Sequence, residues 1–349
     1  MINNSFFSTE ILRWFRENGR DLPWRETRDP YAIWLSEIIL QQTRIVQGWE
    51  YWERFMQTYP KVEDLAAASE DDVLKLWQGL GYYSRARNLH AAAKQIVALG
   101  DFPNTLEGIK SLKGVGDYTA AAIGSFAFDI PAAVVDGNVY RVLSRYFGID
   151  TPINSTQGKK EFAALAQSLL PASDAASYNQ GMMDFGAIQC TPQSPKCLLC
   201  PLAETCEALR SGRVEKLPVK NKTVKVKTRH LSYIYIRCKS SVADGAGNSE
   251  PMVAIHRRGE GDIWQGLWEP YNVSDVKELP SFVKNPILLA KDVKHVLTHR
   301  ILLADFYLLE TETCLQLPDD YIWIKENEIE DYGVPRLIEI MLEKINPAE

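Results

Sequence analysis

The sequence predicts a two-part fold, an all-helical first part followed by a smaller α+β part, and three observations support that prediction. Apolar residues recur at helical spacing in segments from residue 6 to residue 189. Four cysteines then fall within residues 190–206. Beyond a basic segment, residues 210–230, the pattern changes to short runs with strand-like alternation. A chain of 349 residues is long enough for two domains with cores of their own.

Composition is that of an ordinary soluble globular protein, 46% hydrophobic and 24% charged. A net charge of −6 argues against a uniformly basic nucleic-acid binder, but residues 210–230 hold eight Lys and Arg against one Glu. The same composition is typical of a solvated linker, and the segment can be both a linker and a contact for nucleic acid. The N-terminus carries Glu10, Arg13 and Arg16 without a signal-peptide core, and no stretch approaches membrane-span length. We therefore expect a cytoplasmic protein without a membrane partner.

The first two predicted helices lead to a carboxylate in an apolar setting. Residues 6–18 form an amphipathic pattern, and Asp29 followed by Pro30 gives an N-cap and a proline at the first position of a second helix. Glu37 stands in the middle of that helix with apolar neighbours on both sides. Burial there would raise its pKa and let it hold a proton near neutral pH. The alternative is a glutamate on a polar stripe that faces solvent.

Residues 45–107 predict further helices, interrupted by a glycine turn in LWQGLGYYSRARNLH. Gly79 and Gly81 flank Leu80, and Tyr82 follows directly. A tight turn that presents an apolar or aromatic tip is what a loop needs to wedge into a duplex. A helix C-cap followed by core tyrosines is the alternative.

Residues 112–138, LKGVGDYTAAAIGSFAFDIPAAVVDGN, contain a second glycine turn and then a helix pattern over residues 119–128. Gly114 and Gly116 allow a tight turn whose N–H groups lie at a helix N-terminus, an arrangement that suits a phosphate. Asp136 stands at the start of the next helix. The simpler interpretations are an ordinary helix–helix turn for Gly114 and Gly116 and an ordinary N-cap for Asp136.

After a helical stretch over residues 156–189, four cysteines follow with six, two and five residues between them: Cys190, Cys197, Cys200 and Cys206. In a cytoplasmic protein such a cluster indicates a metal site and not disulfides. Zinc is the generic alternative for four cysteines. Cys238 and Cys314 lie in strand-like runs and are expected to be buried free thiols.

The second part predicts a sheet closed by a helix. Four runs have strand character, LSYIYIRC, MVAIHRR, RILLADFYLLE and YIWIK, with a turn-rich ADGAGNSE between the first two. PRLIEIMLEKI, near the end of the chain, has helical spacing. We therefore expect an α+β domain over residues 231–349.

Several of these segments resemble one family of enzymes. LKGVGDYTAAAIGSFAF followed by VVDGNVYRVLSR is similar to the helix-hairpin-helix and catalytic-aspartate segment of the endonuclease III superfamily of DNA glycosylases. SEIILQQT is similar to their catalytic-glutamate motif, and the cysteine intervals match their [4Fe–4S] loop. GLWEPY, and a domain placed after the cysteines, resemble the Nudix-like domain of the MutY-type adenine DNA glycosylases. The resemblance covers nearly the whole chain.

This resemblance implies a fold and a domain order. It implies an N-terminal all-α helix-hairpin-helix glycosylase fold with an iron–sulfur cluster loop over residues 1–209, the basic linker, and a C-terminal α+β Nudix-like domain over residues 231–349. A six-helix module covers about residues 29–135, and the N-terminal helix joins residues 136–209 in a module whose [4Fe–4S] cluster is bound by the four cysteines. A glutamate-rich Nudix box with an R-E-x-x-E-E core is absent from the sequence. The second domain is therefore expected to read a lesion and not to act as a second enzyme.

The same resemblance implies the chemistry. Cleavage of an N-glycosidic bond needs an acid that protonates the leaving base and a carboxylate that stabilises the cationic sugar. Glu37 is implied as the acid, Asp136 as the stabiliser or transient nucleophile, and Asn138 as the residue that orients Asp136. Tyr118 stands where bifunctional relatives carry a lysine that forms a Schiff base. Tyrosine cannot form an imine, so strand cleavage should be absent.

Other positions are implied to contact the flipped base, the gap that it leaves, or the DNA backbone: Trp24, Arg25, Gln42, Thr43, Leu80, Gly81, Tyr82, Gly114, Gly116 and Gln180. Gln180 stands where relatives often have glutamate. Leu297, Thr298 and His299 match a Phe-Ser-His loop that contacts 8-oxoguanine in relatives, and only the histidine is identical.

The sequence therefore predicts a base-excision-repair enzyme that hydrolyses adenine from double-stranded DNA where it is mispaired with 8-oxoguanine or guanine. We expect a monomer associated with the nucleoid. One alternative is an endonuclease III-like bifunctional pyrimidine glycosylase and lyase, disfavoured by Tyr118 and by the extra domain. The other is a catalytically silent iron–sulfur DNA-binding protein, disfavoured because both Glu37 and Asp136 are present.

Overall fold

The computed structural model describes residues 4–221, 226–239, 250–274 and 279–346. The chain forms two compact units, the first made of Met1–Ala67 and Ala91–Lys222, the second of Ala68–His90 and Thr223–Glu349. Most of the turn-rich ADGAGNSE segment and a few residues of the basic linker lie outside the described residues. None of the helices in the described part of the chain has the length and apolar composition needed to span a bilayer.

The first unit is helical, as the sequence predicts. Its helices are α1 (Asn4–Asn18), α2 (Pro30–Ile39), α3 (Ile45–Thr58), α4 (Val62–Ala67), α7 (Leu106–Ser111), α8 (Asp117–Phe128), α9 (Gly137–Phe147), α10 (Thr156–Leu169), α11 (Ala175–Asp184) and α12 (Glu207–Arg210). Short turns of other helix types stand at Pro23–Arg25 and Phe185–Gln189. The helix α6 (Ser84–Leu99) begins in the second unit and ends in the first.

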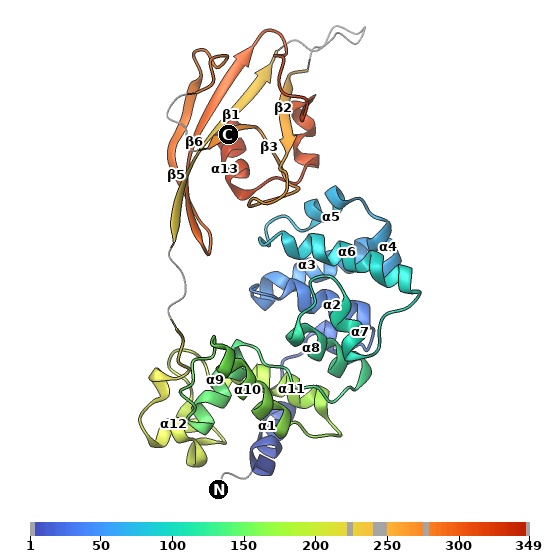
Figure 1. Ribbon diagram of the computed structural model, residues 1–349, viewed down its shortest axis with the longest axis vertical. Helices are drawn as coiled ribbons and strands as arrows, with labels where there is room; N and C mark the ends of the chain where they lie inside the picture. The colour runs from blue at the N-terminus through green and yellow to red at the C-terminus, as the bar shows by residue number, and fades with distance from the viewer. Residues whose placement is uncertain (1–3, 222–225, 240–249, 275–278, 347–349) are drawn as a thin grey trace. The chain divides into compact units, whose positions relative to one another are not determined.

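The helix α2 is buried along almost its whole length, with every residue from Tyr31 to Ile39 shielded from solvent. Asp29 caps it, as expected, by accepting a hydrogen bond from the N–H of Tyr31 at 3.0 Å. The helix packs against α8 (Figure 1). Because the helix is apolar on nearly all sides, its one carboxylate, Glu37, is carried into the interior.

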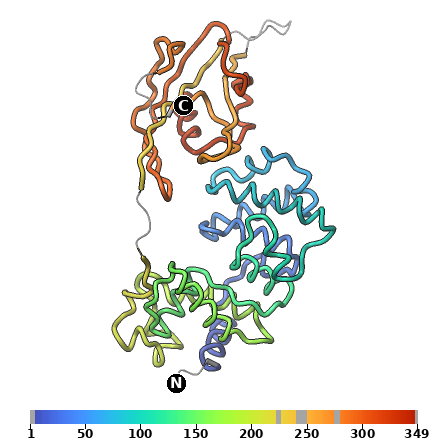
Figure 2. Tube along the Cα trace, in the orientation of Figure 1, coloured from blue at the N-terminus to red at the C-terminus, as the bar shows by residue number. Residues whose placement is uncertain are grey.

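The N-terminal helix α1 packs with helices from a distant part of the sequence, α10 and α11 (Figures 1 and 2). Phe7 and Ile11 of α1 share a core with Tyr146 and Phe162. The Ser8 hydroxyl donates to the Leu169 carbonyl at 2.6 Å within this contact. The amphipathic pattern of residues 6–18 is thereby confirmed as one helix whose apolar face is covered.

A short turn, residues 112–116, joins α7 to α8 and forms the predicted helix-hairpin-helix. Gly114 has a φ of +77°, in the left-handed region that favours glycine. Gly116 has an extended backbone that any residue adopts, and a Cβ atom added there would meet nothing within 4 Å. Of the two glycines, Gly114 is therefore the one whose backbone conformation favours glycine.

The second unit contains a seven-stranded mixed sheet of order β3-β2-β1-β6-β5, with β4 paired to β1 and β7 to β2 (Figure 1). The strands are β1 (Lys227–Cys238), β2 (Met252–Arg257), β3 (Trp268–Glu269), β4 (Tyr271–Ser274), β5 (Ile287–Val296), β6 (Arg300–Thr311) and β7 (Tyr321–Lys325). The unit also holds α5 (Glu70–Leu76) and α13 (Arg336–Ile345). The four predicted strands and the predicted last helix are confirmed.

The sheet has two apolar faces, which the alternation along β1 distinguishes. Tyr233 and Tyr235 belong to the core that includes α13, whereas Ile234 and Ile236 belong to a separate cluster. The strands β3, β4 and β5 were not predicted. Two of them are only two and four residues long, and β5 has two register shifts and a mostly exposed pattern, so strict alternation is missing.

Candidate active site

A cavity of about 450 Å³ brings together six of the residues that the sequence singles out. They come from α2 and the turn after it, from the start of α8, and from the start of α9: Glu37, Gln42, Thr43, Tyr118, Asp136 and Asn138. An adjoining cavity of about 50 Å³ adds three more, Trp24, Arg25 and Gln180. Glu37 lines both cavities, so the two share a carboxyl group as part of their common wall.

Glu37 is 7% exposed, and its Oε2 accepts a hydrogen bond from the Tyr118 hydroxyl at 2.9 Å. Burial raises the pKa of Glu37 to about 7, against the hydrogen bond from Tyr118, which lowers it. The negative charge of Asp136 raises it further, and the positive charge of Arg25 lowers it. A carboxyl group with this pKa is partly protonated at neutral pH, which is the property required of a general acid.

Asp136 is the N-cap of α9, so the simple reading of this residue is correct. Its Oδ1 accepts from the N–H groups of Asn138 and Val139, each at 2.8 Å, and its Oδ2 accepts from the Asn138 Nδ2 at 2.8 Å. Burial raises its pKa, and these hydrogen bonds act in the opposite direction. The cap fixes the orientation of a carboxylate that also lines the cavity, so the capping role and a chemical role are compatible.

The smaller cavity has an aromatic and cationic wall. Trp24 is buried, with its ring centroid 5.8 Å from that of Trp49 and 5.7 Å from that of Trp52. Arg25 lies over the ring of Phe15, 5.6 Å from the centroid. An aromatic and cationic wall beside an acid suits the recognition of a planar, electron-rich base.

Sequence reasoning missed several residues of this site. Arg20 lines both cavities, and Arg44 and Met183 line at least one of them. Asp184 lies next to Met183, is 0% exposed, and forms ion pairs with Arg20 and Arg25. A carboxylate within the apolar run MMDFGAI is the signal that could have revealed Asp184, by the argument used for Glu37.

The four cysteines of the loop line a single cavity of about 30 Å³, together with Arg145 and other residues. Among the described residues, no three His, Cys, Asp or Glu side chains form a group that could hold a single metal ion. Four thiols around a common space are the donor set of a [4Fe–4S] cluster, and the same set also suits zinc. Cys190, Cys197, Cys200 and Cys206 would hold such a cluster.

Two arginines of α9 connect the cysteine loop to the rest of the first unit. Arg145 donates to the Thr191 carbonyl at 2.7 Å, and its Nη1 lies 3.5 Å from the Sγ of Cys190. Arg141 donates to the Cys190 carbonyl at 2.7 Å and to the Asn138 Oδ1 at 2.8 Å. The loop is therefore tied to the same helix start that carries Asp136.

The glycine turn at residues 79–82 belongs to the second unit. Gly79, Gly81 and Tyr82 all have positive φ angles, and Arg85 lies over the rings of Trp77 and Tyr82. Leu80 is 8% exposed and Tyr82 is 46% exposed. The aromatic side chain, and not the leucine, is therefore the exposed tip of this turn.

Leu297, Thr298 and His299 join β5 to β6, directly before a strand as predicted. The Leu297 N–H donates to the Arg300 carbonyl at 2.8 Å, which closes the turn. Within the second unit, the Thr298 hydroxyl and the Tyr82 hydroxyl form a hydrogen bond. The turn for which the resemblance predicts a lesion contact is thus linked to the exposed tyrosine of the glycine turn.

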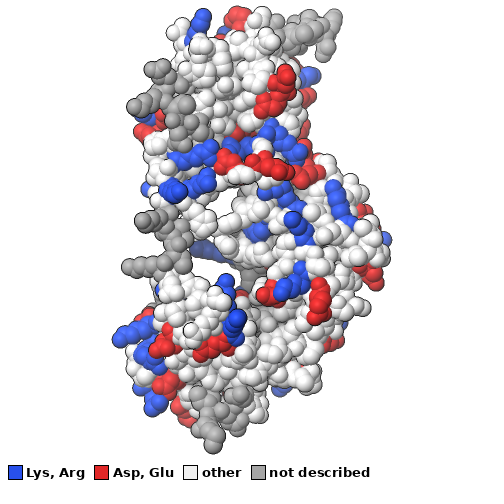
Figure 3. All heavy atoms as spheres, viewed as in Figure 1, with Lys and Arg blue, Asp and Glu red and all other residues white. Residues whose placement is uncertain are grey.

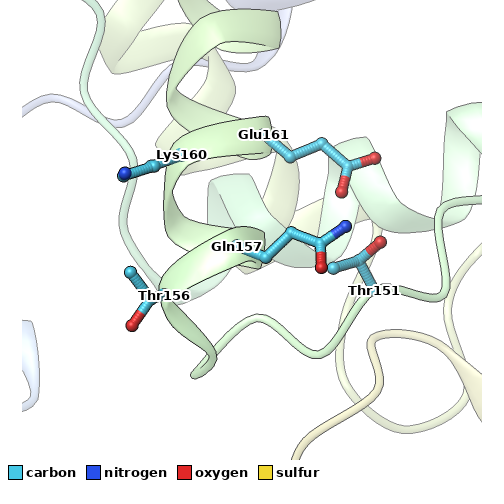
Figure 4. Close-up of a pocket in the computed structure, with 5 residues that line it drawn as sticks. All are labelled: Thr151, Thr156, Gln157, Lys160 and Glu161. Carbon is cyan, nitrogen blue, oxygen red and sulfur yellow. The ribbon is translucent and has the colours of Figure 1, made fainter.

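A larger hollow, of about 700 Å³, lies beside α10 and is lined by Thr151, Thr156, Gln157, Lys160 and Glu161. Figure 4 shows the Lys160 side chain pointing away from those of Gln157 and Glu161, so the polar groups do not converge. On the face seen in Figure 3, basic and acidic side chains lie interspersed, in keeping with the net charge of −6. Neither feature offers a competing centre of chemistry.

Comparison with known families agrees with the geometry. Residues 35–171 match the HhH-GPD superfamily of base excision DNA repair proteins. Residues 190–206 match the iron–sulfur binding domain of endonuclease III, which confirms the predicted [4Fe–4S] cofactor. Residues 246–344 match the NUDIX domain.

Individual relatives agree as well. The chain is 31% identical to the adenine DNA glycosylase of Buchnera aphidicola subsp. Schizaphis graminum, over 97% of this chain and 98% of that protein. It is 42% identical to the adenine DNA glycosylase of Mus musculus, over 61% of this chain and 44% of that protein. A solved thermostable thymine-DNA glycosylase is 34% identical with a TM-score of 0.56, over 60% of this chain and 97% of that one. A trapped endonuclease III–DNA covalent intermediate is 22% identical with a TM-score of 0.53, over 61% and 99% of the two chains, and shares the fold. The chain belongs to the adenine DNA glycosylases of the HhH-GPD superfamily.

Proposed function

We propose that this chain removes adenine from double-stranded DNA where the adenine is mispaired with 8-oxoguanine or guanine, and that it does so without cutting the strand. The observation that carries the proposal is one cavity lined by a carboxyl group with a pKa of about 7, Glu37, and by a second carboxylate oriented by a helix start, Asp136. These are the two groups that hydrolysis of a glycosidic bond requires.

Glu37 is the acid in this proposal. As the bond to the sugar breaks, the leaving adenine becomes electron-rich, and the protonated Glu37 donates to a ring nitrogen of the base. Asp136 stabilises the positive charge that develops on the sugar, or bonds to it transiently before water attacks. Asn138 orients that carboxylate through the hydrogen bond from its Nδ2, 2.8 Å from the Oδ2.

The absence of strand cleavage follows from Tyr118. A bifunctional enzyme needs an amine that forms a Schiff base with the sugar, and the phenol of Tyr118 cannot do so. In addition, this hydroxyl is engaged with Glu37, 2.9 Å away. Its role in the proposal is to hold the acid.

The remaining residues recognise DNA. Trp24, Arg25 and Gln180 line the smaller cavity, where the flipped adenine would lie against Glu37. Gln42 and Thr43 line the cavity mouth, and the exposed N-terminal end of α8 after Gly114 and Gly116 receives a phosphate. In the second unit, the turn of Leu80 and Gly81 presents Tyr82 to the duplex, and Leu297, Thr298 and His299 contact the opposite base. The Tyr82–Thr298 hydrogen bond supports a joint role of these two segments.

The domain boundaries follow from these roles. Residues 1–209 carry excision, although residues 68–90 among them pack in the second compact unit. Residues 210–230 link, and residues 231–349 read the lesion, in a protein that acts as a monomer. When bound, the [4Fe–4S] cluster holds the four thiolates of the cysteine loop together and supplies no proton or carboxylate to the excision step.

A single-turnover assay with excess enzyme tests the proposal. Duplexes carry adenine opposite 8-oxoguanine, guanine, cytosine or thymine, and the products are resolved before and after alkali. We expect excision opposite 8-oxoguanine and guanine, none opposite thymine, and strand breaks after alkali only. Excision of oxidised pyrimidines in place of adenine, or efficient borohydride trapping of the wild-type protein on DNA, would contradict it.

A further inference from the structure

Asp184, the last residue of α11, is a charged side chain with no exposure to solvent. Its two carboxylate oxygens accept from two arginines. Arg20 donates through its backbone N–H and its Nε, each at 2.9 Å, and through its Nη2. Arg25 donates through Nη1 at 2.9 Å and Nη2 at 2.8 Å. The Arg25 Nη1 also donates to the Arg20 carbonyl at 2.9 Å, so the three residues form one closed network.

Both arginines line the smaller cavity, and so does Glu37. Arg20 also lines the larger cavity with Asp136. Asp184 itself is not one of the residues that line either cavity. Asp184 therefore lies behind the cavity wall, and its ion pairs fix the positions of the two guanidinium groups that form part of that wall.

Stability gives little reason for such an arrangement. Removing a carboxylate and two guanidinium groups from water is costly, and a buried ion pair often contributes no more to stability than well-packed apolar residues. What the network does provide is a fixed geometry, because a carboxylate that accepts from two guanidinium forks leaves each of them little freedom. That geometry is set directly beside the proposed acid.

We propose that Asp184 is a positioning residue of the excision reaction, and that its carboxylate fixes Arg20 and Arg25 on the wall of the cavity that holds Glu37. This inference rests on the proposed role of Glu37 as the acid. Asp184 lines neither cavity and acts through Arg25, whose side chain is the cation that acts on Glu37.

The charged and titratable groups that act on Glu37 come from three elements: Tyr118 of α8, Asp136 before α9, and Arg25 of the turn Pro23–Arg25. Arg25 is the one that favours the ionised form of Glu37 by its positive charge. If Arg25 loses its anchor and moves away, the Glu37 pKa rises. The acid then stays protonated to higher pH. The basic limb of the pH–rate profile, where the rate falls as the acid loses its proton, therefore moves to higher pH.

The experiment measures single-turnover excision from pH 5 to pH 10 for the full-length wild type, Asp184→Asn and Arg25→Gln. We expect the basic limb of Asp184→Asn to move up by as much as about 1 pH unit. Arg25→Gln should move it in the same direction, and the double variant should move it no further, because both changes remove one effect. If Asp184→Asn is too unstable to assay, Asp184→Glu replaces it and should give a smaller shift of the same sign.

The control is Glu269→Gln in the second unit. Glu269 is also buried and also paired with an arginine, Arg258, so its neutralisation should lower thermal stability while leaving the limb in place. A basic limb that stays at the wild-type pH in a folded Asp184 variant would overturn the inference, as would a shift to lower pH. Shifts of the two single variants that add fully in the double variant would also overturn it. A wild-type profile without a basic limb would instead overturn the role of Glu37, so the two failures are distinguishable.

Discussion

The Tyr118 hydroxyl donates a hydrogen bond to the Glu37 Oε2 at 2.9 Å, although 81 residues separate them in the sequence. The contact joins the start of α8 to the buried helix α2. It opposes the effect of burial, which raises the pKa of Glu37 to about 7, because a hydrogen bond to a carboxylate favours the ionised form. The side chain to which the proposed function assigns the absence of imine chemistry therefore also lowers the pKa of Glu37.

Tyr118→Phe should therefore raise the pKa of Glu37 and move the basic limb of excision upward by about 1 pH unit or less. The measurement is the pH dependence of the single-turnover rate. Tyr31→Phe is the matched control, since the Tyr31 hydroxyl donates to the Tyr59 carbonyl at 2.7 Å and is absent from both cavity walls. A limb that stays in place in Tyr118→Phe would show that the hydrogen bond does not control the acid.

Glu37→Gln and Asp136→Asn should each reduce single-turnover excision by about 100-fold or more, because each removes a group that acts on the transition state. Binding of the mispaired duplex, measured by gel shift, should stay close to that of the wild type. Glu63→Gln, at an exposed position on α4, is the control. Substantial turnover by either variant would remove that residue from the proposed mechanism.

Glu37→Gln should also stabilise the protein at alkaline pH. The Glu37 pKa is about 7 in the folded chain against an ordinary 4.5, so its contribution to stability is full below pH 4.5 and is lost as pH rises through 7. Glutamine keeps the acceptor for Tyr118 without the charge. We expect an advantage of up to about 3 kcal/mol at pH 8 that disappears near pH 4, measured by urea unfolding. A constant difference at the two pH values would contradict the buried-acid explanation.

Cys197→Ser should reduce the iron content below the about four irons per chain expected for a cubane cluster, and should weaken DNA binding or folding of the 190–206 loop. Its effect on the excision rate of bound duplex should be smaller, since no cluster ligand lines the cavity of Glu37 and Asp136. Cys314→Ser is the control, because Cys314 lies outside the loop and is exposed after the end of β6, so the expectation that it is buried in a strand is wrong. A colourless, folded wild-type protein that binds one zinc would refute the cluster.

Deletion of residues 231–349 should lower the preference for 8-oxoguanine·adenine over guanine·adenine more than it lowers the excision step itself. Thr298→Ala combined with His299→Ala should do so more mildly, by roughly 1–3 kcal/mol, the scale of one or two hydrogen bonds. The measurement is the ratio of single-turnover rates on the two duplexes, and Thr313→Ala, at an exposed position after β6, is the control. A truncated protein that discriminates as well as the full chain would exclude the second domain as the lesion reader.

Local features were predictable where the residues that cause them lie within one short segment. The Asp29 cap and the following proline start α2, and YIWIK, residues 321–325, alternates and pairs as a strand. The strand β5 was missed because its bulges and exposed side chains break the alternation that marks a strand. The turn at Gly114 was recognised from the sequence. Only the structure shows that Gly114, and not Gly116, has a left-handed backbone.

Helix starts, cysteine intervals, the change from helical to strand periodicity and, through resemblance, the family could be predicted from the sequence alone. These depend on residues within one turn, one strand or one loop. The packing of the helices was needed to show that Glu37, Tyr118 and Asp136 line one cavity. It was also needed to show that Asp184 pairs with Arg20 and Arg25 from more than 150 residues away. Such contacts depend on how whole helices pack, because a buried charge is tolerated only where distant elements bring it a partner, and no local pattern encodes that partner.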